Sequence, residues 1–138
     1  MILMIDEEKR RMSTLQESLE ELGYKVTFID NVDTAYEFVA SHQNSISAII
    51  LDIMMPWGES FSSEETKNGL LTGYMLLKKF RENISNIIPI IVYTAVNDPL
   101  LFKSINKEPN CTVFHKPESL SKIVTELQRL KIYPELKE

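Results

Sequence analysis

The run AIILDIMMP at residues 48–56 limits the possible folds of this chain more than any other segment. Its apolar first half is typical of a parallel β-strand that helices cover on both faces. Asp52 follows directly, and a bare carboxylate beside such a buried run would cost several kcal/mol. The sequence therefore predicts that Asp52 has charged partners or a chemical task at the carboxyl end of this strand.

Strand-like and helix-like segments alternate along the rest of the chain. Short apolar or alternating runs predict five strands, at residues 2–5, 24–29, 46–51, 87–93 and 112–115. Apolar residues at helical spacing predict helices at residues 8–22, 32–39, 73–84, 99–105 and 120–130. Asp30 or Asn31 can cap the second helix, and Asp98 before Pro99 can open the fourth. This alternation predicts a doubly wound α/β fold, a five-stranded parallel sheet with helices on both faces.

Composition limits the class of protein and its partners. A chain of 138 residues with 43% hydrophobic and 25% charged residues is ordinary for one globular domain. A net charge of −5 without a Lys/Arg cluster argues against a nucleic-acid partner. The start of the chain turns acidic at Asp6, too early for a secretory signal, and the apolar run 87–96 is too short to span a membrane. Together with a single cysteine, Cys111, these features predict a cytoplasmic protein without a membrane partner.

Two segments fall outside the alternating pattern. Residues 57–72 are rich in Ser, Thr, Glu and Gly and show no sustained period, which predicts a loop inserted after the third strand. Residues 134–138 are expected to be a frayed C-terminal tail. The remainder, within residues 1–133, is expected to form a single domain.

Acidic, hydroxyl and ammonium side chains end the other strands. Asp6 and Glu7 follow the first strand, Thr94 ends the fourth, and Lys116 follows the fifth. Because the carboxyl ends of parallel strands meet at one edge of a sheet, these groups should gather around Asp52. Three carboxylates at short range repel one another, and an oxygen-ligated Mg²⁺ would relieve that repulsion. We therefore predict that Asp52 accepts a phosphoryl group. The metal ion and Lys116 would neutralise the charge of this group, and the Thr94 hydroxyl would hydrogen-bond one of its oxygens.

The chain also carries an ordered set of motifs that resembles the receiver (phosphoacceptor) domain of two-component response regulators. The motifs are ILMIDEE at residues 2–8, LDIMMP at 51–56, GYMLLKKFR at 73–81, VYTA at 92–95 and FHKP at 114–117. The resemblance covers nearly the whole chain and implies a flavodoxin-like sheet with strand order 2-1-3-4-5. It also implies that a histidine kinase, a phosphotransfer protein or a small phosphodonor phosphorylates Asp52. Such a domain is not an enzyme beyond catalysing its own phosphorylation and dephosphorylation.

The resemblance further implies a role for individual residues. The implied ligands of Mg²⁺ are Glu7, Asp52 and the backbone carbonyl of Met54 directly, and Asp6 through water. The groups implied to contact the phosphoryl oxygens belong to Thr94, Ala95 and Lys116. The peptide bond between Lys116 and Pro117 is expected to be cis, a form that proline permits at low cost.

Three features depart from the family pattern. Glu7 stands where the family often has Asp, and its longer side chain should still reach the metal ion. The stretch between Pro56 and Gly73 is longer than usual by about a dozen residues; we expect a gate or a docking surface for a partner, or alternatively a solvated loop. Val113 occupies the position that usually holds Tyr or Phe, and Phe114 should point to the opposite face of the strand. The usual coupling between threonine and this aromatic side chain is therefore in question.

These features favour a stand-alone receiver that acts as a signalling switch through a downstream protein target, homodimerisation or onward phosphotransfer. The alternative is a receiver-like binding module that works without phosphorylation. A haloacid-dehalogenase type of phosphohydrolase is rejected because its second Asp, two residues after the nucleophile, is replaced by Met54. A Rossmann nucleotide-binding domain is disfavoured because no Gly-rich turn follows the first strand.

Overall fold

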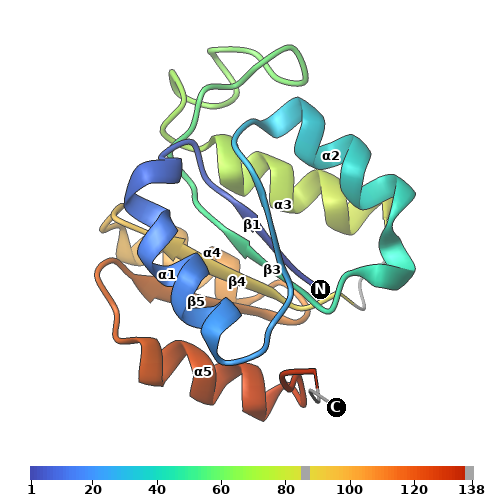
Figure 1. Ribbon diagram of the computed structural model, residues 1–138. Coiled ribbons are helices and arrows are strands. Elements are labelled where there is room, and N and C mark those ends of the chain that lie inside the picture. Colours follow the sequence, from blue (N-terminus) through green and yellow to red (C-terminus); the bar gives the residue numbers. More distant parts are fainter. Residues whose placement is uncertain (85–87, 136–138) are drawn as a thin grey trace.

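A computed structural model describes residues 1–84 and 88–135 and shows one five-stranded parallel sheet (Figure 1). The strand order is β2-β1-β3-β4-β5, which confirms the predicted doubly wound, flavodoxin-like topology. The elements are β1 (Ile2–Ile5), α1 (Lys9–Glu21), β2 (Val26–Ile29), α2 (Val32–Ser41), a 3-10 turn (Gln43–Ser45), β3 (Ala48–Leu51), α3 (Thr72–Asn83), β4 (Ile90–Thr94), α4 (Pro99–Asn106), β5 (Cys111–His115) and α5 (Leu120–Arg129).

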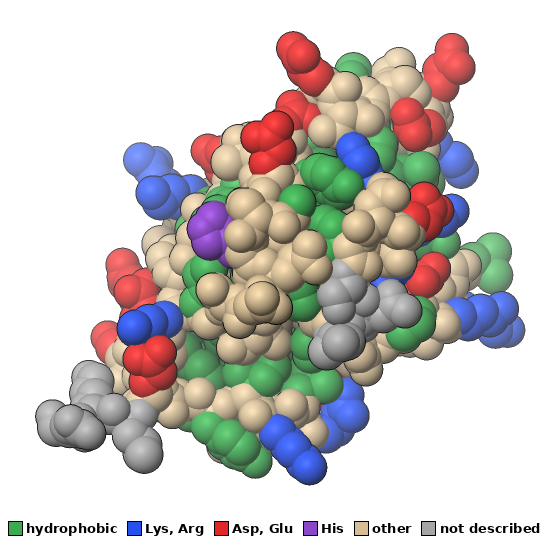
Figure 2. Space-filling model, turned by 90° about the vertical axis from the view of Figure 1, so that its right-hand side faces the viewer, with side chains coloured by type: hydrophobic (Ala, Val, Ile, Leu, Met, Phe, Trp, Pro, Cys, Tyr) green, Lys and Arg blue, Asp and Glu red, His purple; other side chains and the backbone are tan. Residues whose placement is uncertain are grey.

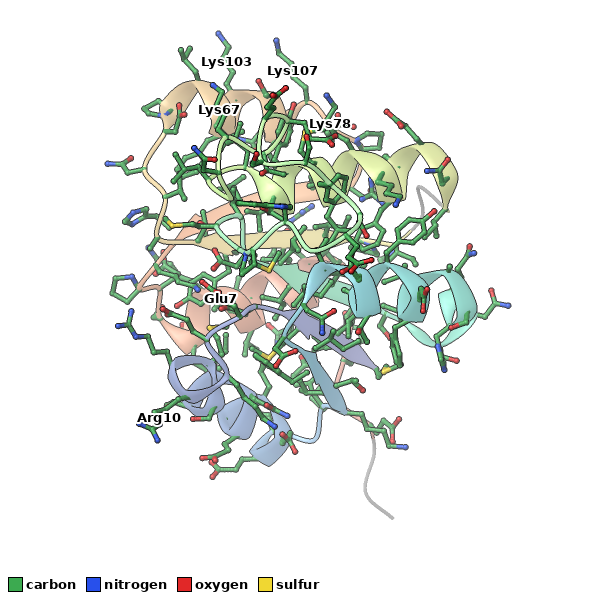
Figure 3. All side chains as sticks on the ribbon, turned by 90° about the horizontal axis from the view of Figure 1, so that it is seen from above. Glu7, Arg10, Lys67, Lys78, Lys103 and Lys107 are labelled. Carbon is green, nitrogen blue, oxygen red and sulfur yellow. The ribbon has the colours of Figure 1, made fainter. Side chains whose placement is uncertain are left out.

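The sheet separates two apolar cores. Alternate strand residues such as Leu3, Ile49 and Val92 pack with α2, α3 and α4 on one face. Their neighbours, for example Met4 and Ile50, pack with α1 and α5 on the other. Figure 1 shows α2 and α3 on one side of the sheet and α1 and α5 on the other, and in Figure 3, seen from above, α1 and α4 lie at opposite ends of the row of strands. All residues of β1 and β3 are buried, as the continuous apolar runs predicted.

Helix starts follow local capping chemistry. The Asn31 side chain accepts a hydrogen bond from the Thr34 backbone N–H at 2.8 Å, so Asn31 rather than Asp30 caps α2. The Asp98 carboxylate accepts from two backbone N–H groups at the start of α4, where proline follows as the sequence suggested. Several boundaries differ slightly from the predictions: β2 begins at Val26, and α3 begins at Thr72. The predicted start of the fourth strand, residue 87, lies outside the described residues.

The inserted segment 57–71 forms turns that are fastened to α2 and α3. The Asp33 carboxylate in α2 accepts hydrogen bonds from the backbone N–H groups of Glu59 and Ser60, each at 2.9 Å, and from the Ser60 hydroxyl. The Lys79 ammonium of α3 lies 5.5 Å from the ring centroid of Phe61. Thr66, farther along, is fully buried. Figure 2 shows acidic side chains gathered at the upper end of the molecule, which the insertion occupies in Figure 1.

The start of the predicted tail contacts the body of the protein. The Glu135 backbone N–H donates to the Gly23 carbonyl at 3.1 Å, and its carboxylate lies 3.4 Å from the Lys25 ammonium. Residues 136–138 of the predicted tail lie outside the described residues. Within the described ranges, no helix combines the length and the apolar character needed to cross a membrane.

Candidate functional site

The carboxyl ends of β1, β3, β4 and β5 open into one pocket. Its volume is about 490 Å³, and its lining includes most of the groups expected from the sequence: Glu7, Asp52, Met54, Thr94, Ala95, Lys116 and Pro117. Parallel pairing explains the convergence, because Ile5 pairs with Leu51, and Leu51 pairs with Val92. The residues that follow these positions therefore emerge side by side. The strand order reverses here, since β1 lies between β2 and β3.

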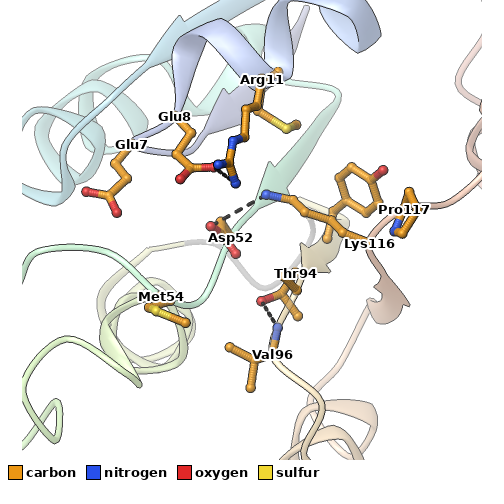
Figure 4. A pocket seen from close by; sticks show the side chains of 12 residues that line it. Glu7, Glu8, Arg11, Asp52, Met54, Thr94, Val96, Lys116 and Pro117 are labelled. Carbon is orange, nitrogen blue, oxygen red and sulfur yellow. Dashed lines mark hydrogen bonds and ion pairs between the residues drawn. The ribbon is translucent and has the colours of Figure 1, made fainter.

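Two buried carboxylates share one ammonium group at this edge of the sheet, although only Asp52 of the two lines the pocket. Asp6 is 1% exposed and Asp52 is 9% exposed. The Lys116 Nζ lies 2.7 Å from Asp6 Oδ2 and 3.6 Å from Asp52 Oδ2. The other Asp6 oxygen accepts the Glu8 backbone N–H at 2.9 Å, so that carboxylate is held at both ends. Figure 4 shows Lys116 extending towards Asp52 from the β5 side of the pocket.

The Thr94 hydroxyl completes the polar groups around Asp52. It accepts a hydrogen bond from the Val96 backbone N–H at 3.1 Å. The same hydroxyl acts against the rise that burial causes in the pKa of the Asp52 carboxyl. One Asp52 oxygen also accepts the Ile53 backbone N–H at 2.8 Å. The site thus places a carboxylate, an ammonium and a hydroxyl around one point, as the strand ends predicted.

Glu7 is placed differently from the expectation that three carboxylates meet. Its side chain lines the pocket, but its carboxylate lies apart from Asp52 and Lys116 (Figure 4). Among the described residues, no three acidic, histidine or cysteine side chains gather closely enough to form a metal cage. Mutual repulsion explains this: Lys116 already neutralises part of the charge on Asp6 and Asp52, and a third carboxylate is better solvated by water.

The charges of Asp6 and Asp52 beside Lys116 nevertheless suit a divalent cation. Burial raises the pKa of Asp52; the Lys116 charge opposes this rise and the Asp6 charge adds to it. Burial alone would lower the pKa of Lys116, but the hydrogen bond to Asp6 and the charges of both aspartates raise it. Two carboxylates against one ammonium leave the pocket with excess negative charge. Asp6 and Asp52 offer oxygen donors only, the kind of ligand that Mg²⁺ prefers, although with Glu7 apart they do not form a metal cage among the described residues.

The backbone around Asp52 is fixed by close packing. The Gly73 backbone N–H donates to the Ile53 carbonyl at 2.8 Å, and a Cβ atom at Gly73 would overlap the Asp52 carbonyl oxygen. The Lys116–Pro117 peptide bond is cis, as the resemblance implied. In β5, Val113 packs against the α2–α3–α4 core and Phe114 against the α1–α5 core, so the two side chains do point to opposite faces.

Three pocket residues carried no sequence signal of their own. Glu8 pairs with Arg11 at 3.3 Å, and both side chains line the pocket. Tyr93 also lines it, with its ring centroid 5.4 Å from Lys116 Nζ. Alternation along β4 could have placed Tyr93 on the α5 side of the sheet. Its contact with Lys116 depends on the path of the chain after β5, which local sequence does not reveal.

The carboxyl edge of this doubly wound sheet thus holds a strand-end aspartate beside a lysine, a threonine and a second aspartate. A sequence model described as the response regulator receiver domain matches residues 2–128. The probable transcriptional regulator ycf27 of Cyanidium caldarium is 34% identical over 99 residues, which are 72% of this chain and 33% of that protein. The chain belongs to the family of response regulator receiver domains of two-component signalling.

Solved structures agree with this fold. The receiver domain of the Francisella response regulator 1452 superposes with a TM-score of 0.72 at 24% identity, covering 94% of this chain and 93% of that one. A response regulator receiver domain protein from Clostridium thermocellum gives a TM-score of 0.77 at 21% identity, covering 94% and 91% of the two chains. Phosphorylation on aspartate and dependence on Mg²⁺ are general properties of the family. The chain spans about a third of the length of the ycf27 regulator that it matches.

Proposed function

We propose that Asp52 accepts a phosphoryl group in a Mg²⁺-dependent reaction and that this chain acts as a signalling switch through contacts with other proteins. The observation that carries the proposal is the arrangement around Asp52. The nearly buried Asp52 carboxylate has one ammonium at 3.6 Å, and it lines, together with the Thr94 hydroxyl side chain, a pocket large enough for a phosphodonor. A carboxylate in such surroundings is an established nucleophile for phosphoryl transfer.

The side chains then have distinct tasks. An Asp52 oxygen attacks the phosphorus of the donor, the bond from phosphorus to the leaving group breaks, and the leaving group departs with the electron pair. Lys116 and Thr94 neutralise and hydrogen-bond the phosphoryl oxygens, with the Ala95 backbone beside them. Mg²⁺ held by Asp6, Glu7, Asp52 and the Met54 carbonyl would supply further positive charge next to the transferred group. In this proposal the chain catalyses only its own phosphorylation and dephosphorylation.

The proposed donor is a histidine kinase or a phosphotransfer protein in the cytoplasm. Output would pass through a downstream protein or through a second copy of the chain. We also propose that the insertion 57–72 is a gate or a docking surface for a partner. Its fastening to α2 and α3 supports this over a solvated loop. Deleting residues 58–68 should then alter phosphotransfer or partner binding, and unchanged rates and affinities would count against it.

A second candidate is a binding module that works without phosphate. The observation that favours it is Val113, which leaves the switch position without an aromatic ring and packs in the α2–α3–α4 core. One experiment separates the two: incubation with Mg²⁺ and acetyl phosphate, followed by intact mass measurement of the wild type and of Asp52→Ala. Addition of one phosphoryl group to the wild type alone supports the switch. No addition to either protein supports the binding module.

A further inference from the structure

Tyr93 lies between the buried core and the Lys116 side chain. It immediately precedes Thr94 in β4, is 8% exposed, and packs in the core formed with α1 and α5. The Lys116 Nζ lies 5.4 Å from the centroid of its ring. An ammonium at this distance from an aromatic face is attracted by the charge distribution of the ring.

The hydroxyl of the same tyrosine holds the chain beyond β5. It accepts a hydrogen bond from the Glu118 backbone N–H at 3.1 Å. The other end of this short segment is held by the Lys116 backbone N–H, which donates to the Thr94 carbonyl at 2.7 Å. Two adjacent residues of β4 therefore restrain residues 116–118 at both ends, and one of them also contacts the ammonium.

Lys116 needs such restraint because two carboxylates compete for its ammonium. The distance to Asp6 is 2.7 Å and the distance to Asp52 is 3.6 Å, so the closer partner is the one that does not take the phosphoryl group. A lysine side chain has a flexible four-carbon stem with many rotamers. A displacement of about 1 Å in a group that stabilises a transition state can cost on the order of 100-fold in rate.

We propose that Tyr93 is a positioning residue that keeps the Lys116 ammonium within reach of Asp52, through its ring and through its hydrogen bond to Glu118. This inference rests on the proposed phosphorylation of Asp52. Tyr93 itself does not contact the transferred group in this assignment. Its effect is carried by Lys116.

The test compares Tyr93→Phe, Tyr93→Leu and a matched control, Tyr24→Phe. Tyr24 is 5% exposed, packs in the same core, and donates its hydroxyl proton to the Ile132 carbonyl at 3.2 Å, away from the pocket. The first measurement is the NMR shift of the Lys116 Cε and its protons, without metal or donor. The second is the initial rate of Asp52 phosphorylation by acetyl phosphate with Mg²⁺.

Tyr93→Phe should shift the Lys116 resonances and slow phosphorylation by about 2- to 10-fold, the equivalent of one net hydrogen bond. Tyr93→Leu, which also removes the ring, should slow it by about a further 2- to 5-fold. Tyr24→Phe should change neither measurement. Lys116 resonances that stay unchanged in both Tyr93 variants, or rates equal to that of Tyr24→Phe, would overturn the proposal. If the wild type takes no phosphoryl group, the proposed function fails, and the resonances alone decide the role of Tyr93.

Discussion

Replacing Asp33 with Asn should loosen the insertion from α2 without unfolding the domain. The Asp33 carboxylate accepts hydrogen bonds from two backbone N–H groups and from the Ser60 hydroxyl. These bonds join residues that are 26 or 27 positions apart in the sequence. A Cβ atom at Gly58, which has a positive φ of 62°, would overlap this carboxylate, so the two segments are in close contact. An amide at position 33 would keep the shape and lose the charge.

The size of the effect follows from the number and the exposure of these bonds. Hydrogen bonds to a charged group are worth about 1.5–3 kcal/mol each when buried. Because Asp33 is only half-buried, solvent screening reduces the combined contribution of its hydrogen bonds to the insertion to about 1–2 kcal/mol. The amides of Glu59 and Ser60 should therefore exchange with solvent about 5- to 30-fold faster in Asp33→Asn than in the wild type. The amides of β1 and β3 should keep their wild-type rates.

The same contact predicts a dependence on pH. The Ser60 hydroxyl, followed by the Glu59 N–H, lowers the pKa of Asp33 below its usual range. A carboxyl with a lowered pKa in the folded state stabilises the fold fully above its unfolded pKa, and this contribution is lost as the pH falls through the folded pKa. The difference between wild type and Asp33→Asn should therefore disappear in strong acid.

Asp30→Asn is the matched control for this experiment. Asp30 is an exposed aspartate at the same end of α2, and its side chain accepts a hydrogen bond from the neighbouring Asn31. This variant changes the same charge near the helix start and should leave the Glu59 and Ser60 amides unaffected. The reasoning is refuted if Asp33→Asn and Asp30→Asn accelerate exchange of the Glu59 and Ser60 amides equally. It is also refuted if the Asp33→Asn effect persists at a pH where Asp33 of the wild type is protonated.

Three further outcomes follow from the pocket. Asp52→Asn should raise the free energy of unfolding near pH 7 by about 1–3 kcal/mol, because burial penalises the ionised carboxylate, and urea titrations should show the gain shrinking in acid. Introducing Met54→Asn and Val96→Asn together should shorten the acyl phosphate half-life by about 5-fold, since the apolar side chains cannot orient an attacking water; an unchanged half-life contradicts this. Gly73→Ala should lower the free energy of unfolding by at least about 2 kcal/mol, because the added Cβ atom would overlap the Asp52 carbonyl oxygen; thermal unfolding measures this loss.

Most of the fold could be predicted because it depends on local signals. Continuous apolar runs identified β1 and β3, and helical spacing identified the five helices, with boundaries wrong by only a few residues. Alternation of strand and helix then allowed few topologies. Once the strands are parallel and adjacent, residues at their carboxyl ends must meet. Asp6, Asp52, Thr94 and Lys116 were therefore placed together from sequence alone.

The details of charge pairing could not be predicted in this way. The sequence suggested three carboxylates around one ion, whereas Lys116 lies closest to Asp6, and the Glu7 carboxylate lies apart. Which carboxylate an ammonium approaches depends on distances of an ångström or less and on how much water each group retains. Neither quantity is encoded in the spacing of residues along the chain.

The sequence by itself determined the sheet, the two apolar cores and the edge at which the reactive groups collect. The spacing of apolar residues and the order of the strands fix these three features. Only the tertiary structure decided that Asp33 holds the insertion and that the Tyr93 ring lies beside the Lys116 ammonium. The physical reason is the same in both cases. These contacts join residues more than 20 positions apart through single side chains, and no periodic pattern accompanies a single hydrogen bond or a single ring contact.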